Sequence, residues 1–347
     1  GRVQAETHTT PESLELQRYL RVMADAGCDS VVMEVSSQAL KMHRVDGIHF
    51  KAAVFTNLGE DHIGPGEHAD FEEYLYYKTR LLNMCGIGLV NKDDEHAPQI
   101  IKAANCELYT YSEESKEADF VATDIRYVSQ PDFVGTEFHI SGKYDMEVRL
   151  GIPGLFNVVN ALAAVSVCSF LGLDQARISH ALENIRVNGR MEIVYTSERC
   201  TVLVDYAHNA VSMESLLSTL RDYKPKRLVC VFGCGGNRSK DRRYSMGEIG
   251  GKMADLSIIT ADNSRYEKVE DIIADIRGSI EKTGGKFIEI PDRREAIRYS
   301  ILHAQPGDMV AVIGKGHEDY QEINGVRHHF LDREVIEETV KELGEKA

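Results

Sequence analysis

The chain has 347 residues, of which 43% are hydrophobic and 27% are charged, as expected for a globular protein of about two domains. Its formal net charge of −15 argues against a general nucleic-acid binder, because such proteins need a basic face. No stretch approaches the ~20 apolar residues that a bilayer crossing requires, so we expect no membrane span.

The first half of the chain alternates helical and strand patterns. An amphipathic pattern over residues 11–26 predicts a helix, with Thr10 as its N-cap and Pro11 at its first position. Apolar β-rich runs predict strands at 30–35, 52–58, 86–91 and 106–111, and helical patterns fall at 71–85, 92–104 and 157–171. This alternation is typical of a parallel α/β sheet, whereas alternating runs within 118–150 predict an antiparallel patch.

The second half repeats a strand–helix pattern at even spacing. Strands are expected at 201–207, 227–233, 256–261, 286–290 and 309–314, and helices at 211–223, 243–254, 269–283, 292–304 and 332–344. Such repeated units are typical of a Rossmann-like domain. The pattern changes near residues 186–192, so we expect one domain over 1–188 and a second over 189–347.

The seven cysteines indicate a reducing environment. Their number is odd, no Cys-x-x-Cys pair occurs, and several lie in apolar runs such as RLVCVFGCGG (227–236). A zinc site would cluster its ligands more closely. We therefore expect buried free thiols in a cytoplasmic protein.

Two residues that follow predicted strands could hold a divalent metal. Glu34 ends the run VVME, and His62 follows the next predicted strand in GEDHIG. Ligands of open parallel sheets bind outside the carboxyl ends of the strands, so a carboxylate and an imidazole could meet there at a metal. The alternative is that each residue caps a loop.

Three polar loops follow strands of the second half. They are FGCGGNRSKDRR (232–243), TADNSR (260–265) and GKGHE (314–318). Singly, the first could be a solvated basic loop and the second an Asx turn, but three such loops at strand ends favour a joint pocket for an anionic ligand. GKGHE is not half of a phosphate loop, because its Lys lacks the following Ser or Thr.

Together these residues resemble the Mur ligase family of ATP-dependent, amide-forming enzymes of peptidoglycan synthesis. Ten features occur in one order: HTTP (8–11), EVSSQAL (34–40), TNLGEDHIG (56–64), Lys78, GLFNVVNALAA (154–164), GRMEIV (189–194), VDYAHN (204–209), FGCGGNRSK (232–240), DNSR (262–265) and GKGHE (314–318). The resemblance implies a ligase that uses ATP and Mg²⁺. It would add the third peptide residue to UDP-MurNAc-L-Ala-D-Glu through an acyl phosphate.

The resemblance also implies roles for residues of the first half. Thr9, Thr10, Ser36 and Arg44 would hold the UDP-MurNAc-dipeptide, and Glu34 and His62 would bind magnesium. Lys78 matches a lysine that is carbamylated in the family. An ammonium repels Mg²⁺, whereas a carbamate offers anionic oxygens. Without the resemblance, an ordinary helix-surface lysine would be the preferred interpretation.

Nucleotide contacts are implied around the domain boundary. They are Asn157, Asn160, Arg190, Asp205, Tyr206 and His208, with Arg190 and His208, besides Lys78, as catalytic candidates. An Asp can accept from ribose hydroxyls, and an Arg can neutralise phosphate charge. The alternative is that Asn157 caps its helix and Arg190 pairs with Glu192.

The pocket for the incoming amino acid is implied in the three polar loops. Its residues would be Arg238, Asp262, Asn263, Ser264, Arg265, Gly314 and Glu318. Arg265 matches the enzymes that add meso-diaminopimelate, where an Arg reads the distal carboxylate, and Glu318 would accept from the distal ammonium. Lysine-adding relatives lack that Arg. Ser264 stands where the family usually has Pro.

The phosphate loop of the family is missing from this sequence. Neither Gly-Lys-Thr nor Gly-Lys-Ser occurs, and the resemblance places that loop before Gly1. We therefore expect a piece of a monomeric ligase without its N-terminal domain and phosphate loop. The alternatives are a non-catalytic relative that keeps the substrate pocket, a lysine-adding enzyme, or a folylpolyglutamate synthetase.

Overall fold

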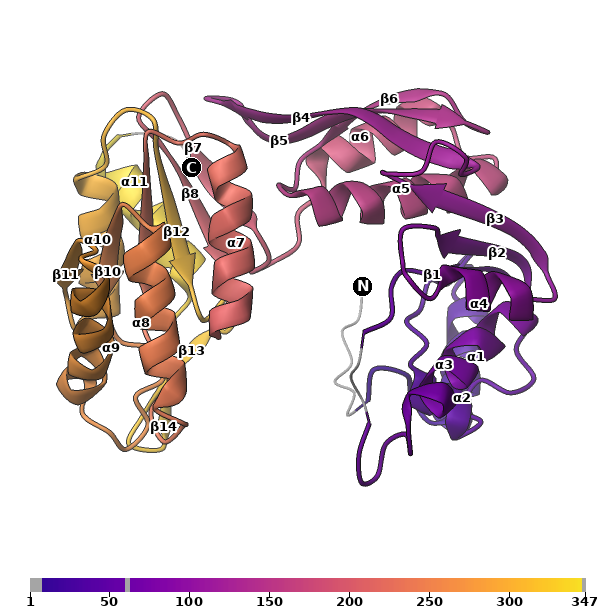
Figure 1. Cartoon of the computed structure of the whole chain (residues 1–347), viewed down its shortest axis with the longest axis horizontal. Coiled ribbons are helices and arrows are strands. Elements are labelled where there is room, and N and C mark those ends of the chain that lie inside the picture. Colours follow the sequence, from indigo (N-terminus) through magenta and orange to yellow (C-terminus); the bar gives the residue numbers. More distant parts are fainter. Residues whose placement is uncertain (1–7, 60–62, 345–347) are drawn as a thin grey trace. The chain divides into compact units, whose positions relative to one another are not determined.

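The computed structural model describes residues 8–59 and 63–344 (Figure 1). The chain divides into two compact units. The first unit takes residues 1–123, 140–146 and 159–174, and the second takes 124–139, 147–158 and 175–347. The expected boundary between residues 188 and 189 stays a prediction.

The first unit contains parallel strands with helices between them. Its elements are α1 (Ser13–Asp25), α2 (Ser37–Lys41), β1 (Phe50–Phe55), α3 (Phe71–Arg80), η1 (Leu81–Asn83), β2 (Cys85–Asn91), α4 (Ala97–Ala103) and β3 (Glu107–Ser112). β2 pairs in parallel with β1 and with β3. A buried cluster that includes Phe55, Leu82, Val90 and Ile100 packs helices on these strands.

Strands β4 (Phe120–Gln130), β5 (Phe133–Gly142) and β6 (Met146–Leu150) extend this sheet in the order β1-β2-β3-β4-β5-β6. β4 pairs in parallel with β3. Only residues 131–132 join β4 to β5, and such a short connection joins antiparallel neighbours. The helices α5 (Leu155–Phe170) and α6 (Gln175–Asn184) follow. The predicted α/β class with an antiparallel patch is confirmed.

Two local predictions for the first unit are wrong. Residues 30–35 form no strand, because an apolar run becomes a strand only with a hydrogen-bonded neighbour, and Val32 is 98% exposed. Helix α1 begins at Ser13 after Glu12, not after Thr10. The Thr10 hydroxyl instead donates to the Glu34 carbonyl at 3.0 Å and accepts from the Ser36 amide.

The second unit has a six-stranded sheet in the order β11-β10-β9-β12-β8-β7. Its strands are β7 (Glu192–Thr196), β8 (Cys200–Asp205), β9 (Arg227–Phe232), β10 (Leu256–Ile259), β11 (Phe287–Glu289) and β12 (Asp308–Ile313). All are parallel except β7, which pairs with β8 in the opposite direction. The carboxyl ends of β8, β9, β10 and β12 therefore meet at one edge of the sheet.

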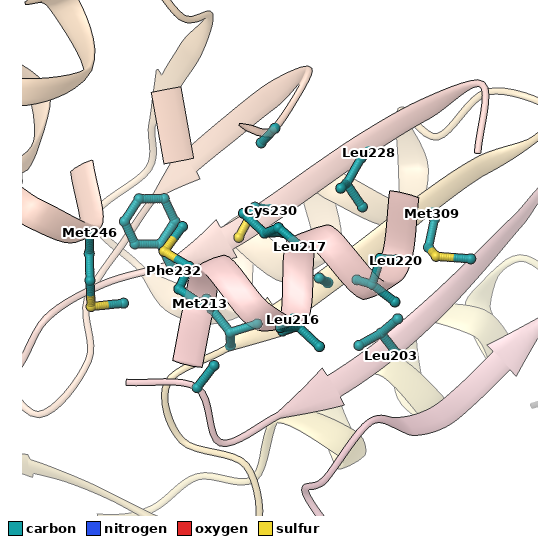
Figure 2. Packing of buried hydrophobic residues seen from close by; sticks show 14 of the residues in the cluster. Leu203, Met213, Leu216, Leu217, Leu220, Leu228, Cys230, Phe232, Met246 and Met309 are labelled. Carbon is teal, nitrogen blue, oxygen red and sulfur yellow. The ribbon is translucent and has the colours of Figure 1, made fainter. Parts of the chain in front are cut away.

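Helices cover both faces of this sheet. They are α7 (Ala210–Asp222), α8 (Asp241–Met253), α9 (Val269–Thr283), α10 (Arg293–Leu302) and α11 (Asp332–Glu342). Alternate residues of each strand face opposite sides. Leu203, Cys230 and Ala311 share a core with α7, α8 and α9, whereas Val202, Val231 and Val312 pack with α10 and α11. Figure 2 shows α7 residues, such as Leu217, lying against the first of these faces.

Several elements carry no prediction from the sequence. They are α2, α6, β7 and the hairpin of β13 (Tyr320–Ile323) with β14 (Val326–His329). The hairpin residues are exposed or half-buried, so they lack the apolar alternation that marks a strand. The seven cysteines are free, as predicted, but only four are buried, whereas Cys106 and Cys168 are half-buried and Cys28 is exposed. None of the helices in residues 8–59 and 63–344 has the length and apolarity that a bilayer crossing requires.

Candidate active site

A cavity of about 640 Å³ lies in the first unit. Residues 30–37 and 50–57 form its walls, so β1 and the segment before α2 face it. Four of the predicted site residues, Thr9, Glu34, Ser36 and Lys78, line it. The structure thus brings together, from segments far apart in sequence, two of the residues predicted for the dipeptide and two of those predicted for magnesium.

Lys78 is held at this cavity in a weakly polar setting. It projects from α3, with its ammonium 5.6 Å from the centroid of the Tyr74 ring. Burial lowers the pKa of Lys78, and the nearby Glu34 carboxylate opposes this only in part. Lys78 is therefore not an ordinary surface lysine. A lowered pKa increases the fraction of neutral amine, the form that can react as a nucleophile.

The donor set for magnesium is described only in part. Glu34 offers carboxylate oxygens beside Lys78, but His62 lies outside the described residues. Within residues 8–59 and 63–344, no three His, Cys, Asp or Glu side chains gather closely enough to hold a metal ion. An unmodified Lys78 ammonium would repel a cation, whereas a carbamate on the same nitrogen would supply the hard oxygen ligands that magnesium prefers.

Thr10, Ser36 and Arg44 form one hydrogen-bonded cluster. Thr10 is fully buried, and its carbonyl accepts from Nη1 of Arg44 at 3.1 Å. Arg44 also pairs with Glu12 at 2.7 Å. The Ser36 hydroxyl accepts from the Ala39 amide and caps α2. The segment before α1 is thereby fixed against the segment before α2.

In the second unit, the loops that follow β8, β9, β10 and β12 contact one another. The Gly236 amide donates to the Asn263 carbonyl at 2.8 Å, and the Gly314 amide donates to the Asp205 carbonyl at 3.2 Å. A Cβ at Gly236 would lie 1.9 Å from the Ser264 carbonyl oxygen. Gly314 has φ +111°, and a Cβ there would lie 2.7 Å from Oδ2 of Asp262. Glycine is therefore required for loop packing at both positions.

Asn263 links its own loop, after β10, to the loop after β12 and to strand β13. Its Nδ2 donates to Oε2 of Glu318 at 3.0 Å, and its Oδ1 accepts from the Glu322 amide at 2.9 Å and from Nζ of Lys315 at 3.3 Å. Lys315 is fully buried and pairs with Glu318 at 3.2 Å. The Tyr206 hydroxyl lies 3.5 Å from the other oxygen of Glu318. One oxygen of the Glu318 carboxylate is therefore already paired with the Lys315 ammonium.

Arg265 occupies a strained position in the same pocket. Its φ of 51° is in the left-handed region. Its amide donates to the Glu322 carbonyl at 2.9 Å, and its carbonyl accepts from the Asn324 amide, so the β13–β14 hairpin holds its backbone. Nη1 donates to the Gly236 carbonyl at 2.7 Å, and Nε lies 3.6 Å from a Glu322 carboxylate oxygen. The side chain thus contacts the loop after β9 on one side and strand β13 on the other.

The remaining predicted pocket residues differ in exposure. Asp262 and Ser264 are buried, whereas Arg238 is exposed on the loop after β9. The Ser264 carbonyl accepts from the Glu267 amide at 3.0 Å. Arg238 is therefore free to approach a ligand from solvent, while Asp262 and Ser264 shape the backbone of the pocket.

Four of the predicted nucleotide contacts lie near the end of β8. Asp205 is nearly buried, and its two oxygens accept from the amides of Met191 and Ala207 at 2.8 and 2.7 Å. Burial raises the pKa of Asp205 despite these bonds and the Arg190 charge. The Arg190 guanidinium lies 5.1 Å from the Tyr206 ring centroid, and the His208 ring lies 4.8 Å from the same ring.

Arg190 does not take its alternative role as the partner of Glu192, and Asn157 makes a contact next to its own helix. Glu192 bonds to Arg333 and to the Gly189 amide, and the Arg190 guanidinium lies over Tyr206 instead. Asn157 donates from the first turn of α5 to the carbonyl of Pro153, which precedes the helix, at 2.7 Å, a local role. Asn157 belongs to the second unit and Asn160 to the first.

Sequence reasoning missed Lys315 as a residue of this site. The signal was present in GKGHE, but a lysine is usually solvated. Its full burial follows from the fold of the loops around it. The Lys315 ammonium is held there by Asn263 and Glu318.

Comparison with known proteins finds two domain matches along the chain. The Mur ligase middle domain matches residues 1–168, and the domain described as Mur ligase, glutamate ligase domain matches residues 189–316. A UDP-N-acetylmuramoyl-L-alanyl-D-glutamate–2,6-diaminopimelate ligase of Caldanaerobacter subterraneus subsp. tengcongensis is 41% identical, over 98% of this chain and 70% of the relative. The ligase of the same name from Trichormus variabilis is also 41% identical, over 96% of this chain and 68% of its own length.

Solved structures agree with this assignment. The structure of a UDP-N-acetylmuramoyl-L-alanyl-D-glutamate–2,6-diaminopimelate ligase matches with a TM-score of 0.79 and 34% identity, over 98% of this chain and 70% of that one. A folylpolyglutamate synthase of Thermotoga maritima, at 18% identity and a TM-score of 0.55, shares the fold alone. With two domain matches in chain order and relatives 41% identical over nearly its whole length, this chain belongs to the Mur ligase family.

Proposed function

We propose that this chain acts in an ATP-dependent ligase of peptidoglycan synthesis that adds meso-diaminopimelate to UDP-MurNAc-L-Ala-D-Glu. The names of the relatives support this substrate pair. ATP would phosphorylate the dipeptide carboxylate, and the amine of the diamino acid would displace phosphate from the resulting acyl phosphate. Cytoplasmic location and a monomeric state stay predictions.

The observation that carries this proposal is that a cation, Arg265, and a carboxylate, Glu318, lie on two loops of the second unit that contact each other. Arg265 and Glu318 lie on loops that Asn263 and Glu322 tie together. The distal end of meso-diaminopimelate carries both a carboxylate and an ammonium, so it requires one group of each charge. A guanidinium can bind the carboxylate through two parallel hydrogen bonds, and the Glu318 oxygen that faces Tyr206 can accept from the ammonium.

Lys315 orients the carboxylate of Glu318. The buried Lys315 ammonium already engages one carboxylate oxygen, so the substrate ammonium would bind the other. Charge-assisted hydrogen bonds on both sides hold the carboxylate in one orientation. The pocket is thus organised before the amino acid enters, which lowers the entropy cost of binding.

In the first unit, the same proposal assigns the cavity to the dipeptide and to magnesium. Thr9 and Ser36 line the cavity, and Thr10 and Arg44 fix the segment that carries them. Glu34, His62 and a carbamylated Lys78 would hold Mg²⁺, which would supply charge neutralisation for phosphoryl transfer. The lowered pKa of Lys78 favours the neutral amine, the form that reacts with carbon dioxide.

Arg190, Tyr206 and His208 are proposed to contact the nucleotide from the second unit. Arg190 is exposed and supported by the Tyr206 ring, so its charge is available to a phosphate. Planar rings at Tyr206 and His208 offer surfaces for stacking. Asp205 is nearly buried and already accepts two amide hydrogens, so a ribose hydroxyl would use a remaining lone pair.

ADP release by the full-length ligase tests this function. With ATP, Mg²⁺ and UDP-MurNAc-L-Ala-D-Glu present, we expect ADP release only when meso-diaminopimelate is added. Turnover with lysine instead would overturn the assigned amino acid but keep the reaction class. No turnover with either diamino acid by an enzyme that binds ATP would favour a non-catalytic relative.

A further inference from the structure

A buried ion pair in the second unit joins α10 to α11. Arg293, the first residue of α10, and Asp332, the first residue of α11, have fully buried side chains. Nε and Nη2 of Arg293 each donate to one oxygen of the Asp332 carboxylate at 2.7 Å. This forked geometry fixes the plane of the guanidinium as well as its position.

The same guanidinium also binds two strand ends. Nη2 of Arg293 donates to the Ile313 carbonyl at 3.0 Å, and Nη1 donates to the Ala261 carbonyl at 3.3 Å. Ile313 is the last residue of β12, and Ala261 lies two residues beyond β10. The next residues in sequence are Gly314 and Asp262. One side chain therefore holds the two backbone segments from which the proposed amino-acid loops depart.

The charge of Arg293 also acts on these loops. Burial lowers the pKa of Arg293, but attraction to Asp332, Asp262 and Glu318 more than offsets this, so the pKa is raised. Two of those three carboxylates belong to the proposed pocket. Arg293 thus acts on the loops both through its hydrogen bonds and through its charge.

We propose that Arg293 is a positioning residue for the incoming diamino acid: it binds the carbonyls of Ala261 and Ile313 and so holds in place the loops 262–265 and 314–318 that follow them. The inference rests on the proposed function, since it takes these loops to be the amino-acid pocket. Buried ion pairs can often be replaced by apolar residues without loss of stability, so stability alone does not account for an arginine here. A loop displacement of about 1 Å can lower turnover on the order of 10²-fold.

The test separates positioning from folding by removing both charges at once. The double variant Arg293→Met/Asp332→Leu leaves no buried charge without a partner. A matched control is Arg294→Met/Glu338→Leu, which removes an exposed ion pair between the same two helices. Both are made in the full-length ligase, with Arg293→Lys as a variant that keeps the charge but loses the fork.

Three quantities are measured for each variant: the melting temperature, amide hydrogen exchange in 261–265 and 313–318, and the kinetic constants with meso-diaminopimelate. For the Arg293→Met/Asp332→Leu variant, we expect faster exchange in both loops and a KM for the diamino acid about tenfold higher, with the KM for UDP-MurNAc-dipeptide unchanged. We expect Arg293→Lys to show an intermediate KM, and the Arg294→Met/Glu338→Leu control to match the parent enzyme.

The proposal is overturned if the double variant melts like the parent and keeps both the parent exchange rates and the parent KM for the diamino acid. It is also overturned if the KM values for the diamino acid and the dipeptide rise together, because that indicates a general structural defect. If the parent enzyme does not use meso-diaminopimelate, the proposed function fails, while the exchange rates still decide whether Arg293 holds the loops.

Discussion

The two units present their candidate residues in different ways. In the second unit, Asn263, Lys315 and Glu318 bond to one another across the loops that follow β10 and β12. In the first unit, Glu34 and Lys78 line a cavity of about 640 Å³ beside a segment that forms no strand. The second site is organised by the protein itself, whereas the first depends on what binds there. Substitutions should therefore act on catalysis in the first unit and on amino-acid recognition in the second.

The largest expected effect is on Lys78. Lys78→Ala removes the proposed carbamate ligand, so we expect kcat of the full-length ligase to fall by roughly 10²–10³, as for loss of a group that stabilises transition-state charge. The KM for the diamino acid should change little. Steady-state ADP release measures both constants.

Lys102→Ala, at an exposed lysine on α4, is the matched control for Lys78→Ala and should leave kcat at the parent value. Incubation with isotope-labelled bicarbonate should produce a carbamate signal by NMR in the parent but not in Lys78→Ala. Parent-like turnover by Lys78→Ala would remove Lys78 from the catalytic set.

A smaller effect is expected for Glu318→Gln. This change keeps the shape but removes the carboxylate charge, so the KM for the diamino acid should rise about 10- to 100-fold. It also leaves the Lys315 ammonium buried without its counter-charge, which should cost about 2 kcal/mol of stability. Kinetics and thermal melting measure the two effects on the same protein.

A double variant separates these two effects. Lys315→Met added to Glu318→Gln should recover the melting temperature without recovering the KM, because the unpaired buried charge is gone but the ammonium acceptor is still missing. Recovery of both would mean that Glu318 acts only as the partner of Lys315.

The smallest effect concerns acid stability of the loop after β9. A hydrogen bond from Arg243 is the main cause that lowers the pKa of Glu267, with a second bond from the Asn237 amide. A lowered pKa contributes stability above the unfolded value of about 4.3. That stability is lost as the pH falls through the lower pKa of the folded protein.

Thermal melts between about pH 7 and pH 3 follow this contribution. Glu267→Gln should melt at a temperature that depends less on pH than the parent does, with the difference greatest above pH 5. Glu270→Gln, at an exposed residue of α9, serves as control. Parallel melting curves for parent and Glu267→Gln would contradict the linkage.

Much of the second unit could be predicted from its sequence. The expected helix at 269–283 has the bounds of α9, which ends at Gly284 with φ 76°, a common helix stop. Strands β8 and β12 are buried along their whole length, so their apolar runs were enough to predict them. The three polar loops were recognised as one pocket because parallel strands end at one edge.

The first unit was less predictable. The run at 30–35 has strand composition, yet a strand also needs a neighbour, and composition does not report one. Thr10 reads as a helix cap, yet its hydroxyl bonds to residues 24 and 26 positions away. Arg293 carried no sequence signal, and GKGHE did not show that Lys315 would be buried, because burial of a charged side chain depends on partners distant in sequence.

The central claim, that the second unit reads both charges at the distal end of the amino acid, is tested most directly by Arg265→Ala. The measurement is the ratio of kcat/KM for meso-diaminopimelate to kcat/KM for lysine, in the parent and in the variant. Loss of the guanidinium should lower this ratio by about tenfold or more, because lysine has no distal carboxylate to lose a partner. An unchanged ratio, with both substrates affected alike, would contradict the claim.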